Sequence, residues 1–203
     1  MVHVSGYTAP AVIEALAIVG IWILLLSAVT FFTLLILSTS VQAIWMVPFI
    51  PTPRAITDGM LDFAELKPGQ IVYDLGAGDG RVLLAAERRE PKIRAVGYEG
   101  AIGVWLLSKF RMWLRGSKVE MRCADFMKNV DFSDADIIFT YLSIESMKKL
   151  KPKFDAQLKD GARVVTHAFR VPGMQPEKER LVTMPFGRGS HIYSYVWRKT
   201  IHN

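Results

Sequence analysis

The chain has 203 residues, of which 51% are hydrophobic, and a formal net charge of +6. This length fits one domain of ordinary size with an appendage, and the apolar content is high for a soluble domain. The lone cysteine, Cys123, excludes an internal disulfide, and the scattered histidines give no Cys/His site with metal-ligand spacing, so we expect no metal. We expect Cys123 to be a small buried residue on a strand over 118–123.

The first 53 residues differ in character from the rest of the chain. All 25 Lys and Arg and 18 of the 19 acidic residues lie at Arg54 or later. The uncharged run from Ala15 to Leu37 is long enough to cross a bilayer about 30 Å thick as a helix. No basic segment precedes it, no clear cleavage site ends it and no face of it is polar, which favours a retained transmembrane helix over about 11–37 rather than a signal peptide or a core helix. Such a helix could also join copies of the chain into an oligomer.

The uncharged segment continues from Val41 to Pro53. Trp45 is typical of a membrane–water interface, and prolines 48, 51 and 53 prevent a long helix. We predict an interfacial segment that lies along the membrane, with a plain linker as the alternative. The domains are therefore 1–53, which holds the membrane segments, and 54–203. Because every Lys and Arg follows the predicted span, we expect a single-pass protein with 54–203 on the cytoplasmic or mitochondrial matrix side.

The part from residue 54 onward alternates between strand and helix patterns. Thr52-Pro53 is typical of a helix start, and residues 56, 60, 61 and 64 then share one helical face. Strands are predicted at 70–75, 94–98, 118–123, 134–142 and 162–169, followed by an antiparallel pair at 181–186 and 191–198. Helices are predicted between the strands at 82–90, 101–115 and 146–158. This order indicates a parallel sheet with helices on both faces.

A glycine-rich turn lies between the first strand and the helix after it, in the stretch from Tyr73 to Arg81 (YDLGAGDGR). Glycines let the backbone bend tightly or approach a ligand, and a helix start favours a carboxylate or a phosphate. A dinucleotide fingerprint would place the third glycine one residue later. An ordinary turn without a ligand is the alternative reading of this motif.

The pattern D-x-G-x-G-x-G from Asp74 to Gly80 resembles motif I of the class I, seven-strand methyltransferases that use S-adenosylmethionine. The resemblance implies a Rossmann-like fold with a mostly parallel seven-stranded sheet, a C-terminal antiparallel hairpin, and S-adenosylhomocysteine as product. Glu99 ends the second strand, where a carboxylate accepts the hydroxyls of a ribose. Asp125 follows the third strand and can accept from an adenine amino group, or else cap a helix.

Further segments resemble a small family of membrane-anchored protein lysine methyltransferases. These segments are residues 48–53 (PFIPTP), 67–81, 150–153 (LKPK) and 161–169 (GARVVTHAF), and the resemblance extends over about residues 10–198. Mitochondrial members modify the ATP synthase c subunit and the adenine nucleotide translocase, and prokaryotic relatives exist. The resemblance implies that Asp74, Gly76 and Gly78 hold the methionine part of the donor. Residues 171–174 lack the tryptophan that is common in the family after the fifth strand.

The expected site has a cofactor part and a catalytic part. The cofactor-binding set is Tyr73, Asp74, Gly76, Ala77, Gly78, Gly80, Glu99, Asp125 and Thr140. In the catalytic set, Tyr141 would form a wall for the substrate amine and His167 or Glu145 would relay its proton, with core packing or a surface role as the alternatives. We expect a lysine methyltransferase of membrane proteins that works at a lipid bilayer and binds no nucleic acid. A methyltransferase of lipids or quinones, and a donor-binding module without catalysis, are the alternatives.

Overall fold

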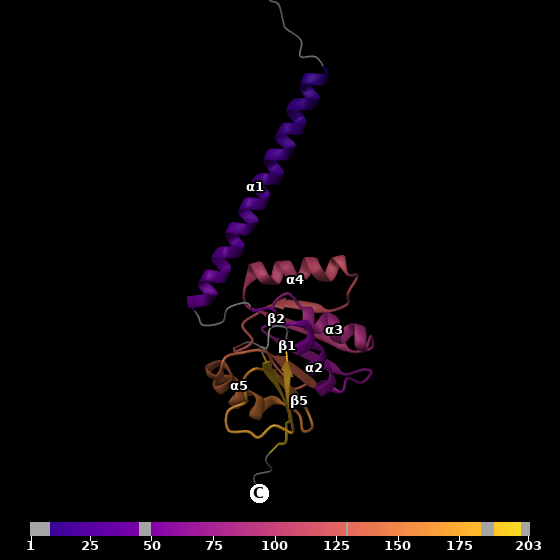
Figure 1. The fold of residues 1–203 in the computed structure, drawn as a ribbon, viewed down its shortest axis with the longest axis vertical. Helices are drawn as coiled ribbons and strands as arrows, with labels where there is room; N and C mark the ends of the chain where they lie inside the picture. The colour runs from indigo at the N-terminus through magenta and orange to yellow at the C-terminus, as the bar shows by residue number, and fades with distance from the viewer. Residues whose placement is uncertain (1–8, 45–49, 129, 184–188, 200–203) are drawn as a thin grey trace, which may run out of the picture.

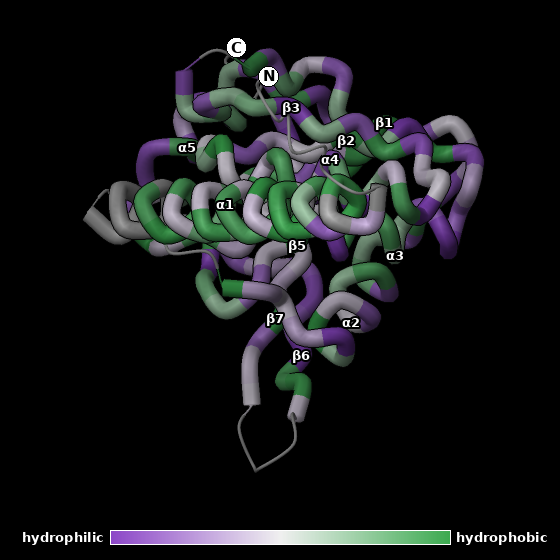
Figure 2. Tube along the Cα trace, turned by 90° about the horizontal axis from the view of Figure 1, so that it is seen from above, coloured by the Kyte–Doolittle hydropathy of each residue, from purple (hydrophilic) through white to green (hydrophobic). Residues whose placement is uncertain are grey.

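The computed structural model describes residues 9–44, 50–128, 130–183 and 189–199, which form one long helix and one α/β domain (Figure 1). Helix α1 (Ala9–Ile44) points away from the domain, and hydrophobic residues recur along its whole length (Figure 2). Its part Val12–Leu37 has 26 residues, none of them buried in the protein, and is long and apolar enough to cross a membrane.

The helix ends later than the sequence pattern suggested. Residues 41–44, which we assigned to an interfacial segment, continue α1, because the serines and threonine at 38–40 are compatible with helix. Trp45, Val47, Pro48 and Phe49, the core of that predicted segment, lie outside the described residues. Residues 50–53 are irregular and lead into the domain.

The domain is built on a seven-stranded sheet with the order β3-β2-β1-β4-β5-β7-β6. Five strands are parallel: β1 (Ile71–Leu75), β2 (Arg94–Glu99), β3 (Glu120–Cys123), β4 (Ile137–Thr140) and β5 (Arg163–His167). Strands β6 (Lys178–Thr183) and β7 (Gly189–Val196) form the antiparallel hairpin, with β7 against β5. The predicted fold class is confirmed.

Helices cover both faces of the sheet and give it two cores. Helices α2 (Arg54–Ala64), α3 (Arg81–Arg89) and α4 (Ile102–Leu114) pack over one core, and α5 (Ile144–Gln157) packs over the other. Successive residues of a strand point to opposite faces, so Val72 joins the first core while Tyr73 and Leu75 join the second. The predicted face of α2 (56, 60, 61, 64) is buried as expected.

Several boundaries differ from the prediction. Strand β6 begins at Lys178 rather than at 181, because this outer strand of the sheet carries charged side chains and so has no apolar pattern at its start.

Strand β4 comprises only 137–140 of the predicted 134–142. Helix α5 begins at Ile144 rather than at 146, because the Ser143 hydroxyl caps it by accepting from the Ser146 N–H (3.3 Å). Pro53 takes the N-cap position of α2 without a side-chain cap. Cys123 is exposed, not buried, because β3 is the other outer strand.

Candidate functional site

A cavity of about 480 Å³ opens at the carboxyl ends of the parallel strands. Ligands of open α/β sheets bind at this edge, outside the point where the strand order reverses. The glycine loop, the tip of β2 and the ends of β4 and β5 contribute to the lining. Residues Ile50, Pro51 and Thr52, which lead from α1 into the domain, line the same cavity. The cavity therefore lies between the parallel sheet and the segment that follows the apolar helix.

The glycine loop is held against the neighbouring strand by its own backbone. The N–H groups of Gly76 and Ala77 both donate to the carbonyl of Tyr98 (2.9 and 3.0 Å). Gly76 has a φ of +75°, which favours glycine, and a Cβ there would lie 3.3 Å from Leu142. Gly76, Ala77 and Gly78 line the cavity, so their main chain can contact a ligand directly.

Glu99 is buried at the tip of β2 and points its carboxylate into the cavity lining. One carboxylate oxygen accepts from the Gly78 N–H and the other from the Ala101 N–H, each at 2.9 Å. Burial raises the pKa of Glu99, and these backbone hydrogen bonds oppose the rise. A carboxylate fixed in this way keeps further acceptor capacity for a polar ligand.

Asp74 and Thr140 bring two more buried polar groups to the cavity, from the adjacent strands β1 and β4. Burial raises the pKa of Asp74 to about 8, and the negative charges of Glu99 and Asp79 add to the rise. The Thr140 hydroxyl is buried and has no hydrogen-bond partner within the described residues. Buried polar groups are normally hydrogen-bonded, so an unsatisfied hydroxyl at a cavity wall indicates a place for a polar ligand.

Asp79, the last acidic residue of the glycine loop, joins three elements through a buried carboxylate. It accepts from Arg81 Nε (2.9 Å) and Nη2 (2.8 Å) and forms a short ion pair with Arg111 of α4. Arg81 also donates to the carbonyl of Thr52 (3.2 Å). Burial opposes ionisation, but the Arg81 hydrogen bonds and the Arg111 charge hold the pKa of Asp79 below its usual range. The segment before α2 is thereby tied to the glycine loop.

Asp125 lies at the other side of the cavity lining, half exposed after β3. Its carboxylate accepts from the Met127 N–H (3.0 Å) and pairs with Lys128 (3.5 Å). The sequence left open whether this residue caps a helix or binds a ligand. The structure has a turn rather than a helix at this point, and Asp125 both stabilises the turn and lines the cavity.

Aromatic rings form the wall nearest to β4 and β5. Tyr141 and Phe169 line the cavity, and their rings stack with centroids 6.3 Å apart. Ala168 has a φ of +66°, and the Phe169 N–H donates back to His167 O (2.8 Å), so a tight turn directs Phe169 towards Tyr141. The Thr166 hydroxyl donates to the Phe169 carbonyl (2.7 Å) and stabilises this turn.

His167 lies behind this wall rather than in it. Its ring centroid is 4.0 Å from that of Tyr141, and Nε2 lies 2.9 Å from the Ser190 hydroxyl. Burial lowers the pKa of His167 to about 4, so the ring is neutral at pH 7 and a weak base. The structure places His167 where it can orient Tyr141 and does not bring it into the cavity lining.

Three other predicted site residues also lie apart from the cavity lining. Glu145 is exposed on α5 and pairs with Lys148 (2.9 Å). Tyr73 points to the second core, where its hydroxyl donates to Asp134 (2.6 Å), because it neighbours Asp74 on a strand and must face the opposite way. Gly80 begins α3, and a Cβ on it would clash with the Met112 side chain, so it provides space for α4.

Sequence reasoning missed part of the lining. Phe169 and residues 50–52 stood in segments that carry the family resemblance, but no site role was predicted for Phe169, and residues 50–52 were read as a membrane-surface segment. Both reach the cavity through tertiary contacts that are distant in sequence.

Comparisons with known proteins agree with this geometry. The family model described as "ANTKMT methyltransferase domain" matches residues 74–178. A protein-lysine N-methyltransferase of Saccharolobus islandicus is 33% identical over 154 residues, which is 74% of this chain and 93% of that protein. A lysine N-methyltransferase of the ATP synthase c subunit from Xenopus laevis and an adenine nucleotide translocase lysine N-methyltransferase of Mus musculus are each 32% identical over 134 residues, or 64% of this chain. The matches span 57% and 56% of those two relatives.

Solved structures share the fold. An RNA methyltransferase from Salinibacter ruber in complex with S-adenosyl-L-homocysteine has a TM-score of 0.67 and 30% identity, and the match covers 75% of this chain and 96% of that one. A precorrin-6y C5,15-methyltransferase from Geobacter metallireducens has a TM-score of 0.60 and 16% identity, over 75% of this chain and 92% of that one. The second likeness concerns the fold alone.

The raised pKa of Asp74 predicts an unusual dependence of stability on pH. With a folded pKa of about 8 against an ordinary value of 3.8, the folded ligand-free protein binds more protons than the unfolded chain between these pH values. The free energy of unfolding should therefore fall as pH rises through this window, by at most about 1.4 kcal/mol per pH unit. In Asp74→Asn the Tm, followed by circular dichroism from pH 5 to 8, should fall less steeply than in the wild type. The matched control is Asp155→Asn, which replaces an exposed aspartate. Equal slopes of Tm against pH for the wild type and Asp74→Asn would refute the raised pKa of Asp74.

Proposed function

Because the chain belongs to the ANTKMT methyltransferase domain family, we propose that it transfers a methyl group from S-adenosylmethionine to the side-chain amine of a lysine in a membrane protein. One observation carries the proposal beyond family membership. A single cavity is lined by the glycine loop and Glu99 and also by residues 50–52, which follow the apolar helix α1. The donor site and the membrane-proximal part of the chain therefore meet in one place.

The residues at the strand ends suit this donor. Asp74, Gly76 and Gly78 would hold its amino-acid part, since a buried carboxyl and open main chain lie together there. Glu99 would accept the ribose hydroxyls, and Asp125 the adenine amino group. The unsatisfied Thr140 hydroxyl would gain a partner among the polar groups of the ligand. When bound, S-adenosylmethionine supplies a methyl group activated by a sulfonium.

The aromatic wall suits the other reactant. Tyr141 and Phe169 present ring surfaces at the cavity, which can hold a lysine side chain and attract its ammonium before deprotonation. An apolar wall also disfavours the charged form of the amine, which eases loss of its proton. His167 holds the Tyr141 ring from behind, so its role is positioning. Correct placement of the amine supplies most of the rate in a displacement of this kind.

The apolar helix suits a membrane substrate. We propose that α1 anchors the chain in a bilayer, with the domain on the cytoplasmic or matrix side, because all Lys and Arg follow it. Anchoring confines the enzyme to the surface where its substrate lies and raises the effective concentration. The named substrates of two relatives, the ATP synthase c subunit and the adenine nucleotide translocase, support a membrane protein as substrate of this chain.

Donor binding should depend on Glu99 and not on Glu145. Replacing Glu99 by Ala removes the charged acceptor of the two hydrogen bonds that we propose from the ribose hydroxyls. Each bond is worth roughly 1.5–3 kcal/mol, so the Kd for S-adenosylmethionine, measured by calorimetry, should rise at least about 100-fold. The matched control, Glu145→Ala, removes an exposed glutamate outside the cavity and should leave the Kd unchanged. Thermal unfolding of both variants checks that the fold persists. Equal affinity of Glu99→Ala and wild type would remove Glu99 from the donor site.

The substrate class is tested with methyl-labelled donor, the purified full chain, and membranes separated after reaction into protein, lipid and RNA fractions. We expect label in a small membrane protein, on a lysine located by mass spectrometry, and none with Glu99→Ala. Label in the lipid or the RNA fraction instead would reject a lysine as acceptor.

Tyr141→Ala should lower the turnover at least about tenfold while changing the Kd for the donor little, because the ring is expected to contact the substrate amine rather than the donor.

A further inference from the structure

Helix α4 carries apolar side chains on two opposite faces. One face packs on the sheet through Val104, Ser108 and Met112, and Trp105 Nε1 donates to the Met121 carbonyl (3.0 Å). The other face carries Ile102, Leu106, Phe110 and Trp113, spaced four, four and three residues apart, which is one stripe of an α-helix. These four residues, here called the outer row, are between 48% and 74% exposed.

The outer row is a patch rather than scattered surface residues. Among the described residues outside α1, the other exposed large hydrophobic residues are Leu114, which continues the row at the helix end, and three that are isolated from one another: Ile50, Ile144 and Leu181. The rings of Phe110 and Trp113 stack with centroids 5.8 Å apart, so the row presents a continuous surface. Contiguous exposed apolar patches of this kind mark interaction sites.

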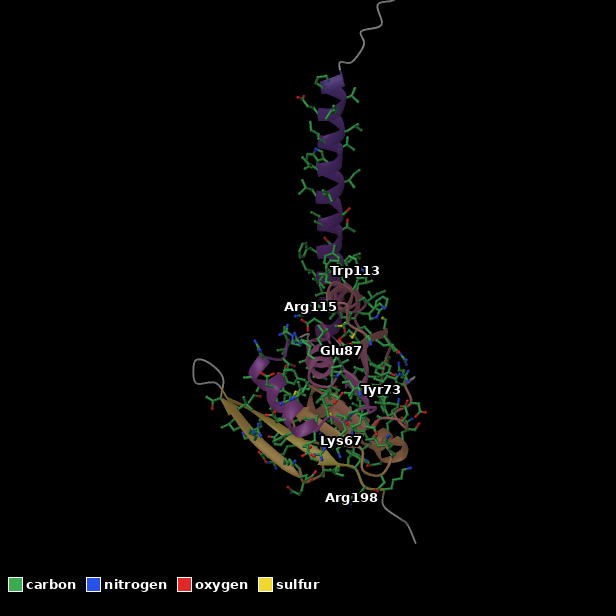
Figure 3. All side chains as sticks on the ribbon, turned by 90° about the vertical axis from the view of Figure 1, so that its right-hand side faces the viewer. Lys67, Tyr73, Glu87, Trp113, Arg115 and Arg198 are labelled. Carbon is green, nitrogen blue, oxygen red and sulfur yellow. The ribbon has the colours of Figure 1, made fainter. Side chains whose placement is uncertain are left out.

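The outer row lies at the end of the domain nearest to the apolar helix. Helix α4 contacts α1 and lies across that end of the domain (Figure 1). Along the long axis of the molecule, Trp113 and Arg115 lie at the level where the domain meets α1, whereas Arg198 lies at the opposite end (Figure 3). A bilayer crossed by α1 would therefore come close to α4.

The charges around the outer row match an anionic surface. Helix α4 has no acidic residue, Lys109 lies beside its apolar row, and Arg115 follows at the helix end. A second cavity, of about 600 Å³, adjoins α4 between α2 and α3. Five arginines line it: Arg54, Arg81, Arg88, Arg89 and Arg111. Arg81 and Arg111 pair with Asp79, Arg89 pairs with Asp62 and Arg54 pairs with Asp58, whereas Arg88 forms no ion pair among the described residues. Guanidinium groups suit phosphates, and basic helices with exposed Trp and Phe bind at the headgroup level of anionic bilayers.

We propose that the outer row of α4 docks on the surface of an anionic bilayer, with lipid phosphates received by the arginine cavity beside it. The inference rests on the proposed function, in which α1 crosses the same bilayer. Two attachment points would fix the rotation of the domain about α1, which a single helix with a connecting segment cannot do. The part of the cavity lined by residues 50–52 is then held at a constant height and orientation over the membrane substrate.

The test places a spin label at single positions of the full chain reconstituted in vesicles. Cys123, which is exposed on an outer strand, is replaced by Ser, and a cysteine is introduced as Trp113→Cys, Phe110→Cys, Leu24→Cys or Leu181→Cys. Leu24 reports on α1, and Leu181 is a matched exposed apolar residue on β6. Collision of the label with oxygen reports lipid, and collision with a water-soluble nickel chelate reports water.

Labels at 113 and 110 should collide with oxygen more than with nickel, as the label at 24 does, while the label at 181 collides mainly with nickel. Labels at 113 and 110 that meet nickel as freely as 181 would overturn the docking, and low collision with both reagents would assign the row to a protein partner instead. A water-exposed label at 24 would instead reject the anchor in the proposed function, whatever the result at 113.

The role of charge is tested in the same samples. Vesicles of phosphatidylcholine with phosphatidylglycerol should hold the label at 113 deeper than vesicles of phosphatidylcholine alone. Arg88→Gln in the arginine cavity should reduce this shift, whereas Arg198→Gln, which removes the same charge at the opposite end, should not. If the label at 113 moves by the same amount in both variants, the arginine cavity has no role in docking.

Discussion

The buried carboxylate of Asp79 is the interaction on which the arrangement of the site depends. It holds Arg81 at the start of α3 and Arg111 in α4, and Arg81 in turn holds the carbonyl of Thr52. A buried charge is tolerated only when it is paired, so the two arginines and the loop are fixed together. One ion cluster therefore fixes the positions of the glycine loop, of the segment that follows α1, and of the helix with the exposed apolar row.

The site itself results from the convergence of polar groups at one edge of a buried parallel sheet. Asp74, Glu99 and Thr140 are withdrawn from water by the strands that carry them, which raises the pKa of both acids and leaves the hydroxyl unsatisfied in the described structure. Opposite them, the left-handed backbone of Ala168 turns Phe169 towards Tyr141 at a cost of about 1–2 kcal/mol. A polar half and an aromatic half thus face one cavity, as transfer between a charged donor and a lysine amine requires.

The fold and the polar half of the cavity could be predicted because they depend on local order in the sequence. The spacing of Gly76, Glu99 and Asp125 along alternating strands and helices determines that they meet at one edge. The direction of single side chains was harder to predict: Tyr73 faces the second core, His167 lies behind Tyr141 beside Ser190, and Glu145 faces solvent. Phe169 and residues 50–52 depend on a strained turn and on a hydrogen bond across 29 positions, which no periodicity encodes. The start of strand β6 was predicted too late for a related reason, because its polar residues give no apolar pattern.

The cavity joins the glycine loop and the strand ends to the segment that follows α1. If S-adenosylhomocysteine binds there, it should protect both parts, which amide hydrogen exchange of the full chain in lipid nanodiscs measures with and without this ligand. We expect slower exchange on binding at the glycine loop, at residues 99–101 and at residues 140–143, together with slower exchange at Ile50 and Thr52. Slower exchange at the strand ends with no change at residues 50–52 would show that the ligand does not reach that segment, and no slowing at the strand ends would show that the cavity is not the donor site.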